Sequence, residues 1–258
     1  MLFDVNAYLG HFAFRQLRHN TPDGLLRQMD DKGIERALVS SASAITYRNV
    51  QSGNEELHAA VRGHRDRLVP LAVINPSYAG WQDDLKACCD EFGMRGLRLY
   101  PKWHNYALAD SRAEQLIAAA SEQGLLVSIP MRVEDYRQRS WLVDVPDVPL
   151  TEIVELVKSH PNGRFLLVNG VGFSRSALGR DSDRLPANYW IEISRLSAVL
   201  DNEIAQLMTS LGPNRLVFGT GMPFTYPDPP LLKLEVLDAP EEFKERIRGR
   251  NAAALVGQ

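Results

Sequence analysis

The sequence predicts a closed parallel α/β barrel of the (β/α)8, or TIM-barrel, type. Its 258 residues are close to the roughly 250 that such a barrel needs. Eight apolar runs turn polar on one face at their C-terminal ends, and helix-patterned stretches separate them. Parallel barrels bring side chains to a common mouth in this way. We therefore expect one domain that spans residues 1–258.

The first predicted strand is the segment FDVNAYLG near the N-terminus. Strict alternation places Phe3 and Val5 on one face. It places Asp4, Asn6 and Tyr8 on the other, where they would reach the mouth. The later strands are expected where short apolar runs end in polar or turn residues. The predicted strands cover residues 3–10, 36–41, 68–74, 96–101, 125–132, 165–170, 189–194 and 215–220.

Helices are expected between these strands from apolar residues at helical spacing and from end signals. Thr21 caps the first helix, a proline follows in its first turn, and Gly33 ends it. Asp110 caps the fourth helix. The predicted helices start near residues 21, 54, 81, 110, 151 and 204, and two short pieces follow at the C-terminus, the second opened by Asn251.

Two connections depart from this pattern. Residues 133–149 form a long, charged connection with Trp141 inside it. A segment of this kind on the functional side of a barrel is usually a lid or a subunit contact, so we expect it to cover the mouth. Residues 172–186 are expected to form a polar loop with at most a short helix.

Composition excludes several classes of function. With 45% hydrophobic and 24% charged residues and a net charge of -3, the chain can build a core. No basic patch predicts nucleic-acid binding, and no apolar run approaches the roughly 18 to 20 residues of a membrane span. The start has no signal-peptide layout, and the adjacent Cys88 and Cys89 fit small packed side chains in a reducing compartment. A cytoplasmic location is expected.

The order of these pieces resembles the amidohydrolase superfamily, in particular its amidohydrolase-related branch of metal-dependent hydrolases and decarboxylases. FDVNAYLG stands where that family has Asp-x-His-x-His-x-Gly, and GLRLYP is similar to its Gly-Ile-Lys-Leu-His-Pro segment. RLVFGTGMPF resembles the family's Arg-Ile-Leu-Phe-Gly-Ser-Asp-x-Pro-Phe pattern. The resemblance covers nearly the whole chain and implies the barrel fold and a homo-oligomer.

The same resemblance implies a metal centre whose ligand positions hold other residues in this chain. The family's two first-strand histidines, its histidines ending strands five and six, and its last-strand aspartate fall on five positions: Asn6, Tyr8, Pro130, Asn169 and Gly221. None is a good ligand for zinc or manganese. Glycine also cannot perform the aspartate's proton transfer. No metal and no other cofactor are therefore expected.

The six histidines offer little to rebuild such a centre. They fall on predicted loops or exposed helix positions, where solvated or capping side chains are expected. His11 and His104 are placed near the mouth, and whether they contribute to another site stays open.

Basic residues follow several strand ends: Arg98, Lys102, Arg132 and Arg195. Guanidinium groups bind carboxylate or phosphate with two parallel hydrogen bonds, so this pattern predicts recognition of a small anion. Arg98 could instead be an interior cation neutralised by Glu192 or Asp4, and both interpretations can hold together.

Tyr8 and Glu192 are inward groups able to act as acid and base without a metal. Tyr8 could instead fill the volume that a histidine and a metal occupy in the family. Asn6 and Asn169 are expected to hydrogen-bond to each other or to a ligand, because inward amides need partners.

Three functions remain open. The first is an amidohydrolase-like barrel that binds a small carboxylate-type anion without metal-assisted hydrolysis, with Asn6, Arg98, Arg132 and Asn169 as ligand contacts. The second is a metal-independent hydrolase, lyase or decarboxylase acting on a carboxylate or lactone, with Tyr8, Lys102 and Glu192 as catalytic residues. The third is a non-catalytic structural or regulatory partner, which a mouth plugged by its own side chains would favour.

Overall fold

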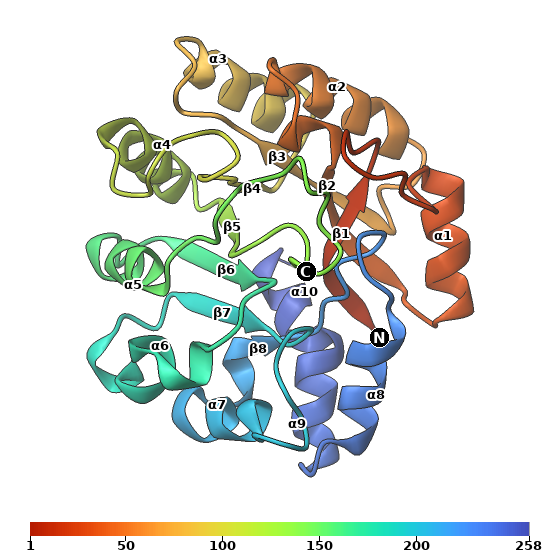
Figure 1. The fold of residues 1–258 in the computed structure, drawn as a ribbon, viewed down its shortest axis with the longest axis vertical. Helices are drawn as coiled ribbons and strands as arrows, with labels where there is room; N and C mark the ends of the chain where they lie inside the picture. Colours follow the sequence, from red (N-terminus) through yellow and green to blue (C-terminus); the bar gives the residue numbers. More distant parts are fainter. Residues whose placement is uncertain (258) are drawn as a thin grey trace.

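Eight parallel strands form a nearly closed barrel in the computed structural model, which describes residues 1–257 (Figure 1). The strands are β1 (Phe3–Leu9), β2 (Arg36–Ser41), β3 (Leu68–Val73), β4 (Gly96–Arg98), β5 (Leu126–Pro130), β6 (Arg164–Val168), β7 (Tyr189–Glu192) and β8 (Leu216–Val217). They pair in sequence order, from β1–β2 to β7–β8. Backbone bonds continue the circle, since the N–H of Val5 donates to Phe218 O at 3.0 Å and that of Tyr8 to Met222 O at 2.9 Å. The predicted barrel fold is confirmed.

Helices lie around the outside of the barrel, except α10, which lies beneath its centre (Figure 1). They are α1 (Pro22–Asp31), α2 (Val50–Val61), α3 (Trp81–Lys86), α4 (Ser111–Glu122), α5 (Leu150–Ser159), α6 (Ala177–Arg180), α7 (Glu203–Leu211), α8 (Asp228–Val236), α9 (Glu241–Glu245) and α10 (Asn251–Leu255). The β6–β7 connection carries only the four-residue α6 between short 3-10 turns. Among residues 1–257, no helix has both the length and the apolarity to cross a bilayer.

Two apolar cores hold the strands of the barrel together, and a third apolar cluster, which includes Tyr8 and Tyr100, lies toward the mouth. The outer core packs strands against helices, for example Leu9 of β1 against Leu25 and Met29 of α1. The inner core joins strand side chains such as Leu166 to Leu255 of α10, so α10 closes the N-terminal end of the barrel. Each fully buried leucine contributes about 1.5–3 kcal/mol. The opposite, C-terminal end of the barrel is its mouth.

The first strand does not alternate as predicted. Its pairing register with β2 shifts between Asp4 and Ala7. Phe3 and Val5 pack in the inner core, and Ala7 packs in the outer core. The irregularity places an extra residue on β1, as a β-bulge does, so simple alternation fails there.

One expected helix start is wrong, and a second helix starts where expected but without the expected cap. Helix α2 begins at Val50 because the Asn49 side chain accepts from Gln51 N at 3.2 Å. Asn54, expected near the start, lies inside the helix and exchanges two hydrogen bonds with the backbone of Val73 on β3. Asn251 does not cap α10, since the preceding residue is already helical. Its amide donates instead to carbonyls that precede and begin β8.

Candidate functional site

Arg98 of β4 fills the centre of the barrel and is completely buried. Its Nη2 donates to Val5 O at 2.9 Å, and its Nη1 to Ala7 O at 3.3 Å. The hydroxyls of Ser128 and Ser40 accept from Nε at 3.2 Å and Nη1 at 3.4 Å. The carbonyls are available because of the irregular backbone of β1. Arg98 thus ties β1 to β4 with charge-assisted hydrogen bonds.

Arg98 is an interior cation, as one of the two interpretations has it, but neither Glu192 nor Asp4 forms an ion pair with it. No carboxylate among residues 1–257 forms an ion pair with it. Both oxygens of Glu192 accept from backbone N–H groups, at 3.0 and 2.6 Å. Asp4 accepts from the N–H of Thr220 at 3.0 Å and from its hydroxyl at 2.5 Å. Burial raises the pKa of Asp4 to about 6, and burial also raises the pKa of Glu192.

A layer of phenols separates Arg98 from the mouth. The Arg98 guanidinium lies over the Tyr8 ring, 4.9 Å from its centroid. The hydroxyl of Tyr100 lies 3.1 Å from Ser40 Oγ. Burial raises the pKa values of Tyr8 and Tyr100 above 10.0, and Arg98 only partly offsets this. The Tyr8 hydroxyl is buried and has no hydrogen-bond partner within the described chain.

The positions that correspond to the family's metal ligands meet beside this layer. Asn6 Nδ2 donates to Asn169 Oδ1 at 3.1 Å, which confirms the expected amide pair. A side chain at Gly221 would begin 3.4 Å from that same oxygen, but also 2.6 Å from Thr225 Oγ1. Gly221 has φ +75°, a backbone conformation that L side chains rarely adopt. This donor set is two amides and a phenol, so it does not fit a transition metal.

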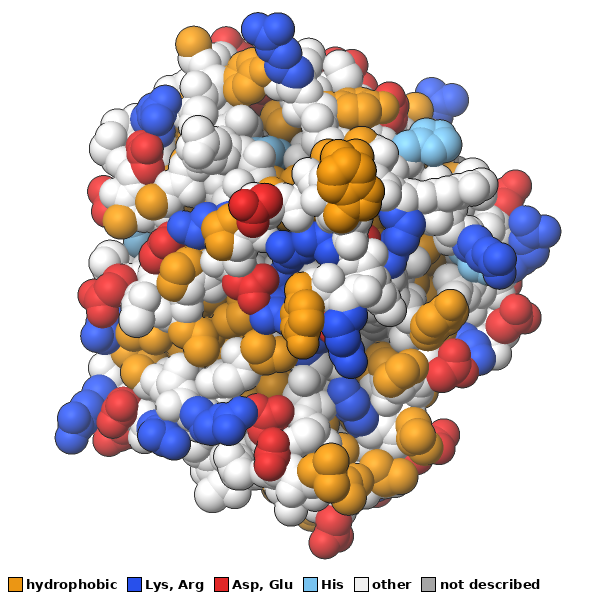
Figure 2. All heavy atoms as spheres, viewed as in Figure 1, with side chains coloured by type: hydrophobic (Ala, Val, Ile, Leu, Met, Phe, Trp, Pro, Cys, Tyr) orange, Lys and Arg blue, Asp and Glu red, His pale blue; other side chains and the backbone are white. Residues whose placement is uncertain are grey.

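A small cavity lies at the mouth, above Tyr100. Its volume is about 10 Å³, which is room for roughly one water molecule. Lys102, Arg132 and Arg139 line it together with apolar side chains such as Val148. We call it the mouth cavity. Basic side chains gather across the middle of this face in Figure 2.

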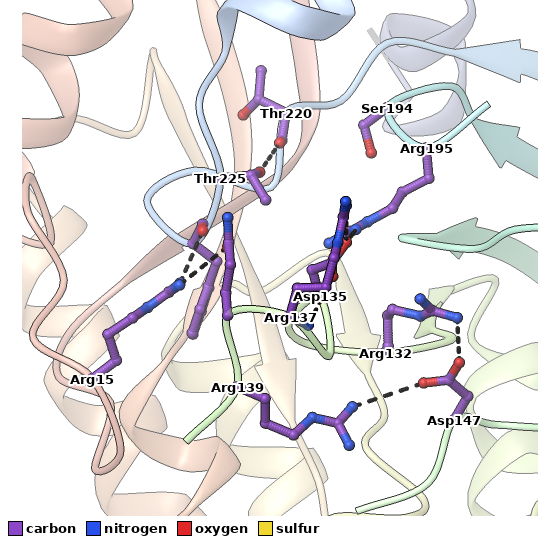
Figure 3. A network of polar contacts seen from close by, with 12 residues as sticks. Arg15, Arg132, Asp135, Arg137, Arg139, Asp147, Ser194, Arg195, Thr220 and Thr225 are labelled. Atoms are coloured by element: carbon purple, nitrogen blue, oxygen red, sulfur yellow. Dashed lines mark hydrogen bonds and ion pairs between the residues drawn. The ribbon is translucent and has the colours of Figure 1, made fainter. Parts of the chain in front are cut away.

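The lid segment, residues 133–149, lies over this mouth, as expected. At its start, Arg15 from the loop after β1 lies 3.2 Å from Glu134 Oε1. Arg195, from the loop after β7, lies 2.9 Å from Asp135 Oδ2. Arg137 also binds Asp135, and these contacts hold the pKa of that carboxyl well below its usual range. Figure 3 shows Arg15, Asp135 and Arg195 on three separate loops at the mouth.

At the end of the lid segment, Asp147 forms ion pairs with both arginines of the mouth cavity. Its Oδ2 binds Arg132 Nη2, and its Oδ1 lies 3.9 Å from Arg139 Nη2 (Figure 3). Lys102 pairs with Glu152 of α5 at 2.6 Å. The Nε groups of Arg132 and Arg139 are buried and have no hydrogen-bond partner within residues 1–257.

Only some of the predicted site residues come together. Arg132 and Lys102 share the mouth cavity, whereas Arg98 lies below it and does not line it. No hydrogen bond or ion pair of the described residues joins Lys102 to Tyr8 or Glu192, so the three candidate catalytic residues form no contacting group. Their catalytic role stays a prediction.

Neither of the two histidines near the mouth rebuilds a metal site. His11 is exposed. His104 is half-buried, its Nε2 lies 3.1 Å from Ala44 O, and burial lowers its pKa to about 4. This enclosure rules out a solvated side chain, which was one of the two alternatives expected for the histidines. Within residues 1–257, no three His, Cys, Asp or Glu side chains are grouped as metal ligands.

Sequence reasoning missed Arg139, which lines the mouth cavity, and Asp147, which pairs with both arginines of that cavity. Both lie in the lid segment, whose irregular chain gives no periodic signal. The available signal was the number of charged residues in this segment.

The sequence matches the family model described as amidohydrolase over residues 11–258. A search of curated proteins finds no significant match. Among solved structures, 2,6-dihydroxybenzoate decarboxylase complexed with 2,6-dihydroxybenzoate is similar, with 16% identity and a TM-score of 0.75, covering 99% of each chain.

Two further solved structures share the architecture. The 5-carboxyvanillate decarboxylase of Sphingomonas paucimobilis has 16% identity and a TM-score of 0.76, covering 99% of this chain and 98% of that chain. The dihydroxybenzoic acid decarboxylase of Polaromonas, with bound manganese and 2-nitroresorcinol, has 17% identity and a TM-score of 0.69, covering 91% and 85%. At such identities the similarity shows the fold.

Proposed function

The chain belongs to the amidohydrolase family, and we propose that it binds a small carboxylate-type anion at the barrel mouth without metal-assisted hydrolysis. One observation carries this proposal. Arg132 and Arg139 both line the mouth cavity, share the single carboxylate of Asp147, and keep buried Nε donors without partners within the described chain. Buried donors left unpaired are costly, so an anion that accepts from them gains affinity.

The charge balance of the mouth favours the same ligand. The ion pairs around the lid segment join six cations to four carboxylates. Except for Arg137, which is 74% exposed, the side chains of these cations are at most 27% exposed, so salt screens their charges weakly. The solved structures that resemble this barrel include enzymes acting on aromatic carboxylates.

Binding requires the lid segment to move. The mouth cavity of about 10 Å³ is far smaller than the roughly 300 Å³ of an ordinary ligand site. The carboxylate of Asp147 therefore takes the place of a ligand carboxylate. A ligand must displace it from Arg132 and Arg139. The ligand contacts are then these two arginines and Lys102. Of the four predicted contacts, Arg98 below the phenol layer and Asn6 and Asn169 beside it act as positioning residues.

Metal-assisted hydrolysis is not part of the proposal because of the donor chemistry. A catalytic zinc needs about three imidazole, carboxylate or thiolate ligands. Asn6, Tyr8 and Asn169 offer amide oxygens and a phenol whose pKa burial raises above 10.0. The buried guanidinium of Arg98 also lies against Tyr8 and repels a second cation.

A second candidate is a non-catalytic structural or regulatory partner, favoured because the chain's own side chains fill the mouth and leave a cavity of only about 10 Å³. A metal-independent hydrolase, lyase or decarboxylase is favoured less, because no hydrogen bond or ion pair of the described residues joins Glu192 to Tyr8 or Lys102, and because the backbone N–H groups that donate to both Glu192 oxygens stabilise its carboxylate form.

Calorimetric titration with benzoate distinguishes the candidates, using the wild type, Asp147→Asn and Arg132→Gln. We expect Asp147→Asn to bind benzoate at least tenfold more tightly than the wild type, and Arg132→Gln to lose binding. Asp144→Asn is the matched control, because Asp144 is exposed in the same segment and forms no ion pair with the described residues. Absence of saturable binding by both wild type and Asp147→Asn at millimolar benzoate would reject the anion site and leave the regulatory partner.

A further inference from the structure

A second hollow opens beside the lid segment, between the loop after β1 and the loop after β8. Its volume is about 380 Å³, within the range of small-molecule sites. Arg15, Arg18, His19 and Gln28 line one side, and Tyr226 lines the other. None of these five residues lines the mouth cavity. We call this hollow the side cleft.

The side chains that line the side cleft fit an anion that also carries a hydrogen-bond donor. Arg18 is exposed and forms no hydrogen bond or ion pair with the described residues. Gln28 Oε1 is buried and accepts no hydrogen bond within residues 1–257. It therefore needs an N–H or O–H group from a ligand or a water. Tyr226 leaves an aromatic ring 74% exposed at the rim.

The loop that carries Arg18 and His19 is fixed in place. Gly10 N donates to Asn20 O at 2.8 Å, and Asn20 Nδ2 donates back to Gly10 O at 3.0 Å. Gly24 of α1 allows close approach, since a Cβ there would lie 2.9 Å from His19 Cα. A cleft formed on such a loop is largely preorganised, which lowers the entropic cost of binding.

We propose that the side cleft binds a small organic anion bearing a hydroxyl or amino donor, such as a phosphate monoester, and that this binding loosens the lid segment through Arg15. The anion binds Arg18 and His19, and its donor binds Gln28 Oε1. The site stands independently of the function assigned to the mouth.

Arg15 connects the side cleft to the lid segment. It lines the cleft, its Nε lies 3.2 Å from Glu134 Oε1, and it donates to Gln138 Oε1 at 3.3 Å. Its Nη2 also donates to Phe224 O at 2.8 Å. The side chain of Glu134 is 1% exposed, and neither of its carboxylate oxygens has a hydrogen-bond partner among the described residues.

The side cleft and the lid segment are coupled because a bound anion and Glu134 compete for Arg15. An anion in the side cleft draws this guanidinium away and leaves Glu134 as a buried charge without its counterion, which is strongly unfavourable. The closed position of the lid segment then loses stability. By linkage, whatever opens the lid segment also tightens binding in the side cleft by the same factor.

Calorimetry with glycerol 3-phosphate, inorganic phosphate and glycerol tests the site on the full chain. We expect saturable binding of glycerol 3-phosphate at least fivefold tighter than that of phosphate, and no binding of glycerol. Arg18→Gln should weaken the binding of glycerol 3-phosphate at least fivefold. Arg62→Gln is the control, an exposed arginine at the end of α2 without a partner among the described residues, and should bind as the wild type does.

Two results would overturn the proposal. One is equal binding by wild type and Arg18→Gln; the other is loss of glycerol 3-phosphate binding in Arg132→Gln, which would place the anion in the mouth cavity. The coupling has its own readout in the fluorescence of Trp141, which lies in the lid segment and is 90% exposed. Glycerol 3-phosphate should change this emission in the wild type but not in Arg15→Gln, and an identical change in both would refute the coupling.

Discussion

The guanidinium of Arg98 lies 4.9 Å from the ring centroid of Tyr8 in the closed interior of the barrel. A desolvated cation–π contact of this kind contributes about 2 kcal/mol. It places a permanent positive charge next to the residues that correspond to metal ligands in the family. The barrel centre is thus built around a side-chain cation, with backbone carbonyls and hydroxyls as its partners.

Replacing Arg98 by lysine should destabilise the fold strongly. Lysine carries a charge but cannot reproduce the planar fork that reaches Val5 O, Ala7 O and Ser128 Oγ at once. We expect the free energy of unfolding in urea to fall by about 3 kcal/mol or more. Arg112→Lys, which alters an exposed ion pair with Asp110, should leave the midpoint of urea unfolding unchanged. A loss at Arg98 no larger than at Arg112 would contradict the assigned role.

The buried carboxyl of Asp4 should give the fold a pH dependence. Burial raises its pKa from 3.8 to about 6, so the folded state binds its proton more tightly than the unfolded chain. The protonated Asp4 carboxyl therefore contributes fully to the free energy of unfolding below about pH 4, and this contribution is lost as the pH rises through about 6. The contribution lost is about 3 kcal/mol.

Asp4→Asn isolates this effect. Asparagine can keep both hydrogen bonds that Oδ1 accepts, from Asn6 N and Thr220 N. We expect the difference in unfolding free energy, wild type minus Asp4→Asn, to decrease between pH 4 and pH 6 and to stay level above it. A difference that increases over this interval would show that Asp4 is stabilised as a carboxylate.

The sequence predicted the barrel because the periodicity of strands and helices survives even where regular strand pairing is short, as in β4 and β8. It also predicted the pairing of Asn6 and Asn169, since inward amides at two strand ends need partners. The partners of Arg98 could not be predicted, because they are mainly backbone carbonyls exposed by an irregular strand. Asp147 was missed because a long irregular segment has no period that places its side chains.

The ion pairs at the start of the lid segment should control its opening. Asp135 accepts from both Arg137 and Arg195. Asp135→Asn removes about 1 kcal/mol of this attraction, so we expect trypsin to cleave within residues 133–149 about fivefold faster. High salt should accelerate wild-type cleavage in the same direction. Asp144→Asn should cleave at the wild-type rate, and equal acceleration in both variants would argue against a specific latch.

Self-association remains a prediction from family resemblance, and the lid segment offers a surface for it. Trp141 is 90%, Tyr136 71% and Leu142 63% exposed. Exposed apolar groups of this size mark interaction sites more often than isolated surface residues do. We expect the wild type to sediment as an oligomer at micromolar concentration and Trp141→Ser to sediment more slowly. A wild-type monomer would contradict the prediction.

The last prediction is that zinc and manganese do not bind in a saturable way among Asn6, Tyr8 and Asn169. Tyr8 would have to ionise although burial raises its pKa, and Asn169 Oδ1 already accepts from Asn6 at 3.1 Å. Arg98 adds a repelling charge beside them. Titration with either metal should therefore give either no saturable binding at micromolar concentration or binding that Asn6→Ala and Asn169→Ala leave unchanged.

A single restored ligand should not create the site. Asn6→His supplies one imidazole, whereas about three good ligands are needed before a bound water approaches a pKa of 7. Gly221→Asp adds a carboxylate, but its Cβ would lie 2.6 Å from Thr225 Oγ1 on a backbone with φ +75°. We expect neither variant to bind zinc at micromolar concentration. Saturable wild-type binding that Asn6→Ala and Asn169→Ala abolish would refute the prediction, because it would show that these amides are ligands.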